Sequence, residues 1–144
     1  MNCLLASIYI KNGIMSVILM RNGMLIDKVV ERITDDSVEG STFKSVLFAL
    51  SKAMRMVRNY IQNNQDCNDV VFELNNSIVI KWVEDNYAKD EYNDLLHEVI
   101  SLLQELPIRY KFSYIVKPKA FLYAKDKYVS KKLSISGIDF DSIS

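Results

Sequence analysis

The sequence has few of the residues that mark metal centres and disulfide frameworks. Its 144 residues include two cysteines, one histidine, two prolines and four glycines. Cys3 and Cys67 lie far apart and outside any Cys-x-x-Cys or Cys/His grouping, which excludes a structural zinc motif and indicates free thiols in a reducing compartment. His97 lies off the apolar stripe of its predicted helix, and we expect it at the surface. These absences predict a protein without a cofactor or a structural metal.

Net charge and long apolar runs are lacking as well. The formal net charge is zero with 25% charged residues, so the total excludes both a disordered acidic chain and a globally basic one. The apolar stretches of residues 1–20 are interrupted at Lys11, Asn12 and Gly13 after too short a run to cross a bilayer. We therefore expect a cytoplasmic protein without a membrane span.

The hydrophobic content, 49%, is enough for one domain with a real core. We expect a single domain over residues 1–136 and a flexible tail over residues 137–144. Three apolar segments come first, at residues 3–10, 14–20 and 24–33, and two Asn-Gly pairs separate them. Loops this short cannot carry a parallel crossover, so the three segments predict an antiparallel meander.

The rest of the chain alternates between helical and strand patterns. The spacing of apolar residues predicts a long helix from Ser41 or Thr42 to about Ile61, and strands at residues 70–74 and 108–116. A short helix to about Asp85 and a second helical stretch at residues 90–106 lie between these strands. A basic helix over residues 119–133 follows. We predict an α/β fold with a five-stranded mixed sheet flanked by helices.

This order of elements resembles the ribonuclease H-like fold over essentially the whole chain. Residues 42–53, with the Ala49-Leu50 step, look like the first helix of that family. Residues 70–79 look like its fourth strand and the start of the next helix, and residues 115–118 look like the end of its fifth strand. Members of the family hydrolyse the RNA strand of an RNA/DNA hybrid with two divalent metals, which implies four clustered carboxylates.

Three of the four positions that the resemblance assigns to these carboxylates are neutral. They fall at Ser7 in the first strand, Thr42 in the first helix and Asn75 after the fourth strand. The terminal-helix aspartate matches Asp126. Glu73, Glu39, Asp139 or Asp141 could restore single ligands from other places, although the substitution of three ligands at once makes this unfavourable. Asn75 also has a simpler interpretation, as the cap of the helix that follows it.

The end of the chain is rich in basic residues. Between Arg109 and Lys132 the only acidic residue is Asp126. Phe121, Tyr123 and Tyr128 are interleaved with these charges and could stack on bases. The alternative is a solvated helix face whose aromatic residues belong to the core. The candidate nucleic-acid-binding residues are Lys117, Lys119, Lys125, Lys127, Lys131 and Lys132.

The sequence favours a non-catalytic ribonuclease H-like module, a pseudoenzyme that binds nucleic acid or a nucleoprotein partner through its basic C-terminal region, in a nucleic-acid-handling or viral setting. A protein-interaction or scaffold domain, in which apolar faces around Trp82 and Tyr92 or the meander's edge join a partner or a second copy, is the alternative. A divergent metal-dependent nuclease that uses Glu73, Asp126 and Asp139 is the third interpretation and the least favoured.

Overall fold

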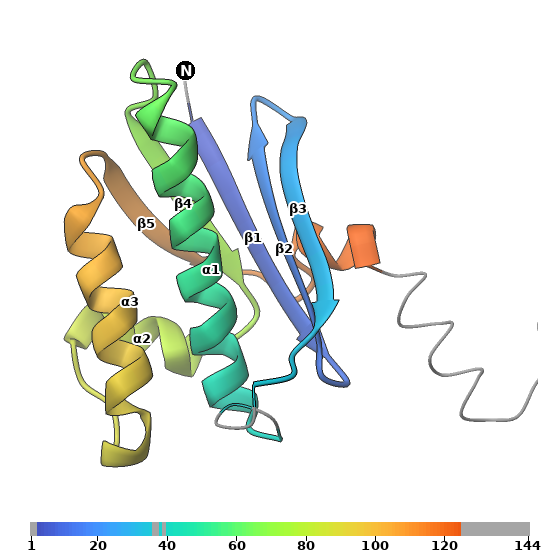
Figure 1. The fold of residues 1–144 in the computed structure, drawn as a ribbon, viewed down its shortest axis with the longest axis vertical. Helices are drawn as coiled ribbons and strands as arrows, with labels where there is room; N and C mark the ends of the chain where they lie inside the picture. The colour runs from blue at the N-terminus through green and yellow to red at the C-terminus, as the bar shows by residue number, and fades with distance from the viewer. Residues whose placement is uncertain (1–2, 36–37, 39, 125–144) are drawn as a thin grey trace, which may run out of the picture.

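Five strands form one mixed sheet in the computed structural model of the chain, which describes residues 3–35, 38 and 40–124 (Figure 1). Their order across the sheet is β3-β2-β1-β4-β5. The first three strands are antiparallel, whereas β4 runs parallel to both β1 and β5. This arrangement confirms the predicted five-stranded sheet that begins with a meander. The strands are β1 (Cys3–Lys11), β2 (Ile14–Arg21), β3 (Met24–Arg32), β4 (Asp69–Leu74) and β5 (Arg109–Tyr114).

Both turns of the meander use an asparagine followed by a glycine. Asn12 and Gly13 have φ angles of 55° and 75°, and Asn22 and Gly23 have φ angles of 51° and 81°. Left-handed backbone at both central residues is what a two-residue hairpin turn requires, because its twist then matches that of the strands. The Asn-Gly pairs therefore fix the antiparallel register locally.

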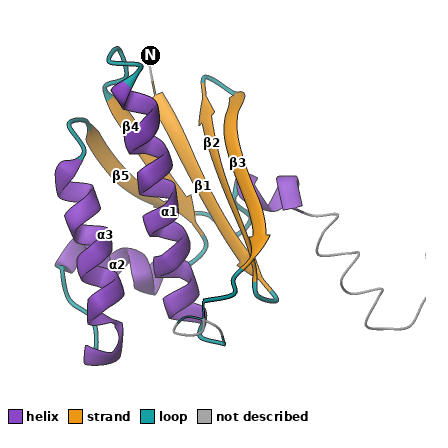
Figure 2. Ribbon diagram, in the orientation of Figure 1, coloured by secondary structure: helices purple, strands orange, loops and turns teal. Residues whose placement is uncertain are grey.

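Helices cover both faces of this sheet, but unequally. The larger layer lies on one face, and a helix over residues 119–124 lies on the opposite face, where it packs against β1, β2 and β3 and is seen behind β2 and β3 (Figure 2). We refer to this second face as the reverse face. Among the described residues, no helix is long and apolar enough to cross a membrane. The larger layer comprises α1 (Thr42–Gln62), α2 (Ser77–Asp85), the short 3₁₀ helix η1 (Asp90–Tyr92) and α3 (Asn93–Glu105).

The main core lies between the sheet and α1. Side chains alternate along a strand, so Leu4, Ala6 and Ile8 of β1 face this core, and the residues between them face the helix of residues 119–124. Phe72 of β4 is fully buried and stacks on Phe112 of β5, with 5.5 Å between the ring centroids. The core therefore depends on β4, which lies between the meander and β5.

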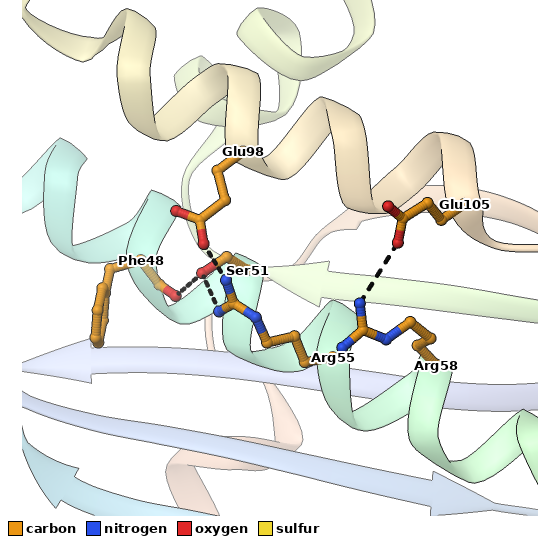
Figure 3. A network of polar contacts seen from close by, with 6 residues as sticks. All are labelled: Phe48, Ser51, Arg55, Arg58, Glu98 and Glu105. Carbon is orange, nitrogen blue, oxygen red and sulfur yellow. Dashed lines mark hydrogen bonds and ion pairs between the residues drawn. The ribbon is translucent and has the colours of Figure 1, made fainter.

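Two ion pairs tie α1 to α3 across the outer surface of the helical layer (Figure 3). Arg55 bonds Glu98, and it also donates to the hydroxyl of Ser51 at 3.3 Å. One turn further along, Arg58 lies 3.4 Å from Glu105. These side chains are partly exposed, so each pair is expected to contribute about 1 kcal/mol or less. The pairs align the two helices more than they stabilise them.

One detail of the predicted elements differs from the structure. The alternation of Tyr110, Phe112 and Tyr114 with more polar residues is typical of a strand with one buried face, but Tyr110 and Tyr114 are 48% and 54% exposed, and only Phe112 joins the core. The reason is that β5 is the last strand of the sheet and packs against a neighbour on one side only. The terminal helix begins at residue 119 as predicted, and its predicted continuation from residue 125 to residue 133 lies outside the described residues.

We predict that Phe72→Ala lowers the free energy of unfolding by about 3–5 kcal/mol, because the substitution leaves a cavity between β4 and β5. Urea denaturation followed by circular dichroism measures this change. Ile78→Ala, at a site that is 51% exposed on α2, is the matched control and should change the stability by about 0.5 kcal/mol or less. Equal effects of the two substitutions would contradict the described core.

Candidate functional site

The carboxyl ends of β1 and β4 adjoin a hollow of about 390 Å³. The turn after β1, the first residues of α1 and the residues that follow β4 form its walls. Crevices outside the carboxyl ends of parallel strands are the usual ligand sites of α/β sheets. The lining residues are Ile10, Lys11, Asn12, Gly13, Gly40, Ser41, Thr42, Ser45, Val46, Asn75 and Asn76.

Two of the four positions assigned by resemblance meet at this hollow. Thr42 is the first residue of α1, and the exposed Asn75 follows the end of β4. Both are neutral, and no aspartate or glutamate is among the described lining residues. Lys11 contributes the only charged side chain of the described lining. Glu39, which precedes α1 in sequence, lies outside the described residues.

The prediction that Asn75 caps the following helix is wrong by one residue. The cap of α2 is Asn76, whose side-chain oxygen accepts a hydrogen bond of 2.9 Å from the backbone N–H of Val79. Asn76 has the extended backbone that a cap requires. Two adjacent asparagines made the sequence ambiguous at this point. Asn75 is left as an exposed amide at the rim of the hollow.

Ser7, the first-strand position, is buried on the reverse face of the sheet and takes no part in the hollow. Parallel pairing of β1 with β4 places it directly beside Glu73. The Ser7 hydroxyl donates a hydrogen bond of 2.8 Å to Oε1 of Glu73. Glu73 is only 2% exposed, so this carboxylate lies inside the protein.

The start of the helix over residues 119–124 closes this polar pair. The backbone N–H of Lys119 donates to Oε1 of Glu73 at 2.6 Å, and the N–H of Ala120 donates to the Ser7 hydroxyl at 2.8 Å. Ser16 of β2 donates to the carbonyl of Ala120 at 2.7 Å. The first N–H groups of a helix have no partner within the helix, and here Glu73 and Ser7 accept from two of them, whereas Ser16 donates to a carbonyl of the same turn.

This network decides what the site can hold. Two nearby divalent cations need several oxygen ligands, chiefly carboxylates. Ser7 offers a hydroxyl that already donates and accepts, Thr42 and Asn75 are neutral and lie elsewhere, and Glu73 is engaged beneath the helix. Within residues 3–35, 38 and 40–124, no group of three or more histidine, cysteine, aspartate or glutamate residues could hold a metal. The described residues do not fit a two-metal centre.

The other predicted site residues are only partly described. Lys117 and Lys119 are exposed at the connection from β5 to the last helix. Phe121 packs edge-on against Tyr9, with 5.1 Å between the ring centroids, and Lys117 Nζ lies 5.4 Å from the centre of the Phe121 ring. Asp126, Tyr128, Asp139, Asp141 and the candidates Lys125, Lys127, Lys131 and Lys132 lie outside the described residues.

A larger hollow, of about 1030 Å³, lies at the other end of the sheet and holds none of the predicted site residues. Arg58, Glu105 and Arg109 line it, together with Cys67. Cys67 is a buried free thiol, and burial raises its pKa. A thiol in this state is a poor nucleophile. His97, in contrast, is exposed on α3, as expected.

Sequence reasoning missed the Ser7, Ser16 and Glu73 network. A signal was present, because all three residues interrupt strands whose neighbouring positions are apolar. The sequence did not identify the partners of these residues, because Glu73 is 66 positions from Ser7 and Ala120 is 104 positions from Ser16. Pairing over these distances depends on the sheet register.

The geometry defines an α/β protein with a meander followed by two parallel crossovers to β4 and β5. Solved structures of ribonuclease H1 share this arrangement, so the chain has a ribonuclease H-like fold. No protein-family model matches it, and no curated protein matches it in sequence.

Three solved structures illustrate the likeness. A ribonuclease H1 isolated from compost by a metagenomic approach is 12% identical, with a TM-score of 0.59 over 80% of this chain and 85% of that one. Ribonuclease H1 from Halobacterium salinarum is 10% identical, with a TM-score of 0.53 over 79% and 84% of the two chains. A foamy viral protease-reverse transcriptase, solved with double-stranded DNA, is 11% identical, with a TM-score of 0.55 over 81% of this chain and 20% of that one.

We predict that Ser7→Ala lowers the free energy of unfolding by about 1–3 kcal/mol, because it removes one of the two hydrogen bonds to Glu73 and leaves the N–H of Ala120 without its buried acceptor. It should also speed hydrogen exchange at the amides of Lys119 and Ala120. Ser77→Ala, at an exposed site in the first turn of α2, is the control and should do neither. Unchanged exchange at residues 119–120 in the Ser7 variant would contradict the network.

Proposed function

We propose that this chain is a non-catalytic ribonuclease H-like module that binds nucleic acid, or a nucleoprotein partner, through its basic C-terminal region. The observation that carries the non-catalytic part is the closed network at Ser7. The first-strand ligand position is a hydroxyl whose hydrogen bonds go to Glu73 and to the backbone of Ala120. A cation at that position would have to displace the start of the last helix.

The charge of the C-terminal region supports the binding part. Lys117 and Lys119 are exposed where the region begins, and no ion pair with an acid holds either of them among the described residues. Four further lysines follow in sequence within residues 125–132. Lysines with hydrated ammonium groups attract phosphates without reading sequence. Binding of this kind is weak, sequence-tolerant and strongly dependent on salt.

One observation favours the alternative of a protein-interaction domain. Met24 and Leu25 are 73% and 40% exposed at the start of β3, which is an edge strand of the sheet. An open edge strand with apolar side chains can pair with another chain. A homodimer that light scattering detects equally at low and high salt, together with no binding of nucleic acid, would favour this function.

Fluorescence anisotropy with labelled single-stranded, duplex and RNA/DNA hybrid oligonucleotides tests the proposal. We expect binding at low salt that weakens steeply between about 50 and about 200 mM salt. Neutralising Lys125, Lys127, Lys131 and Lys132 to glutamine should weaken binding and flatten the salt dependence. The matched control makes the same change at four lysines of the helical layer and its connections. It should leave the affinity and its salt dependence unchanged. The four lysines are Lys44, Lys52, Lys81 and Lys89.

Two outcomes would contradict the proposed function. The first is undetectable affinity of the unaltered chain for every oligonucleotide at low salt, which would remove nucleic acid binding. The second is cleavage of the hybrid's RNA strand with magnesium or manganese present, which would restore a nuclease with relocated ligands. The proposal predicts intact hybrid after prolonged incubation with either metal.

A further inference from the structure

Basic residues gather on the reverse face of the sheet, although the chain as a whole has no net charge. Elsewhere the charge is mixed: residues 84–105 hold seven acidic residues against Lys89, whereas α1 holds four basic residues and no acidic one. The reverse face and the connection that crosses it carry mainly basic side chains. We call this surface the basic sheet face, and it comprises Lys28, Arg32, Arg109, Lys111, Lys117 and Lys119.

Strand register places these side chains on the reverse face. Lys28 of β3 pairs with Ile18 of β2, which packs under Ala120 of the last helix. Paired residues of adjacent strands share a face, so Lys28 lies beside that helix. Arg32 lies on the same face, four residues further along β3.

The same argument places the basic residues of β5. Phe112 faces the main core through its stacking on Phe72. Its neighbour Lys111 therefore faces the other way, and it pairs with Val71 of β4. Arg109 pairs with Asp69 on that side of the sheet. Basic residues thus lie on the reverse face both on β5 and on β3, where the last helix packs over Val30 between Lys28 and Arg32.

These charges are available to a partner. All six side chains belong to exposed residues. Among the ion pairs of the described residues, only the pair of Arg109 with Asp69, at 3.7 Å, involves this face, and the Arg109 side chain remains 84% exposed. The acids that β3 carries, Asp27 and Glu31, pair with core-facing residues of β2 and lie on the other face. Apart from Asp69 and the buried Glu73, the strand residues that share this face therefore include basic but no acidic side chains.

We propose that the basic sheet face is a binding surface for a nucleic acid backbone, which crosses from β3 over the last helix to β5. This inference rests on the proposed function and extends its interface from the C-terminal region to the sheet.

A matched pair of double variants tests the surface. Lys28→Gln with Lys111→Gln removes one charge on each side of the last helix, outside the C-terminal region itself. Lys81→Gln with Lys89→Gln removes the same charge from the helical layer. Anisotropy with single-stranded and duplex oligonucleotides, repeated over a range of salt concentrations, measures affinity and its salt dependence. Thermal unfolding checks that each variant retains the fold.

Each lost phosphate contact lowers the slope of log affinity against log salt by about 0.7 for single strands and about 0.9 for duplexes. The Lys28/Lys111 variant should therefore lose about 1.4 to about 1.8 in slope. If affinities converge at about 1 M salt, this is a loss of about 25-fold for a single strand and about 60-fold for a duplex at about 0.1 M. The Lys81/Lys89 variant should bind as the unaltered chain does.

The outcomes separate this inference from the proposed function. If the C-terminal lysine variant binds more weakly and the Lys28/Lys111 variant binds as the unaltered chain does, the proposed sheet surface is wrong and the proposed C-terminal site stands. No binding by the unaltered chain would overturn both. Equal losses in the Lys28/Lys111 and Lys81/Lys89 variants would show a general charge effect and overturn the surface. Capture of a polyglutamate peptide but of no oligonucleotide would assign this face to an acidic protein instead.

Discussion

The structure depends on one buried arrangement of polar groups, in which Ser7 and Glu73 lie side by side and the first N–H groups of the last helix close over them. A buried carboxylate is costly unless hydrogen bonds replace the water it has lost. Here a hydroxyl and a backbone N–H replace that water, and the carboxylate in turn bonds a helix end that has no internal partners. The sheet side chains and the helix N–H groups thus satisfy each other's hydrogen bonds, and the network holds the last helix on the reverse face of the sheet.

That arrangement is the basis of the proposal that this ribonuclease H-like chain is non-catalytic. The parallel pairing of β1 with β4 brings two chemically active positions together, as the fold dictates. In this chain they are a hydroxyl and a carboxylate that bond each other and the helix, and the neutral Thr42 and Asn75 line a separate hollow. The same strand register can thus serve a structural contact in place of a cation site. The proposed function therefore rests on the surface, on the basic sheet face and the C-terminal region.

Local features of the sequence were enough to predict most of the fold. The Asn-Gly turns at residues 12–13 and 22–23 fix antiparallel neighbours, and helical periodicity over residues 42–61 fixes α1. Features that depend on distant pairing were not predictable. Ser7 could be assigned to a strand, but its partner is 66 residues away. Tyr110 and Tyr114 alternate as a half-buried strand should, yet they are exposed because β5 lies at the edge. The face on which Lys111 lies could be assigned only from the structure, because it follows from the stacking of Phe112 on Phe72.

The central claim is that the strand positions that could hold cations are committed to the protein's own hydrogen bonds. Calorimetric titration of manganese into the intact chain tests it most directly. The account predicts no saturable heat of binding, in the unaltered chain and in Glu73→Gln alike. Saturable binding that Glu73→Gln abolishes would contradict it, because it would place a cation on a residue that the network is held to engage.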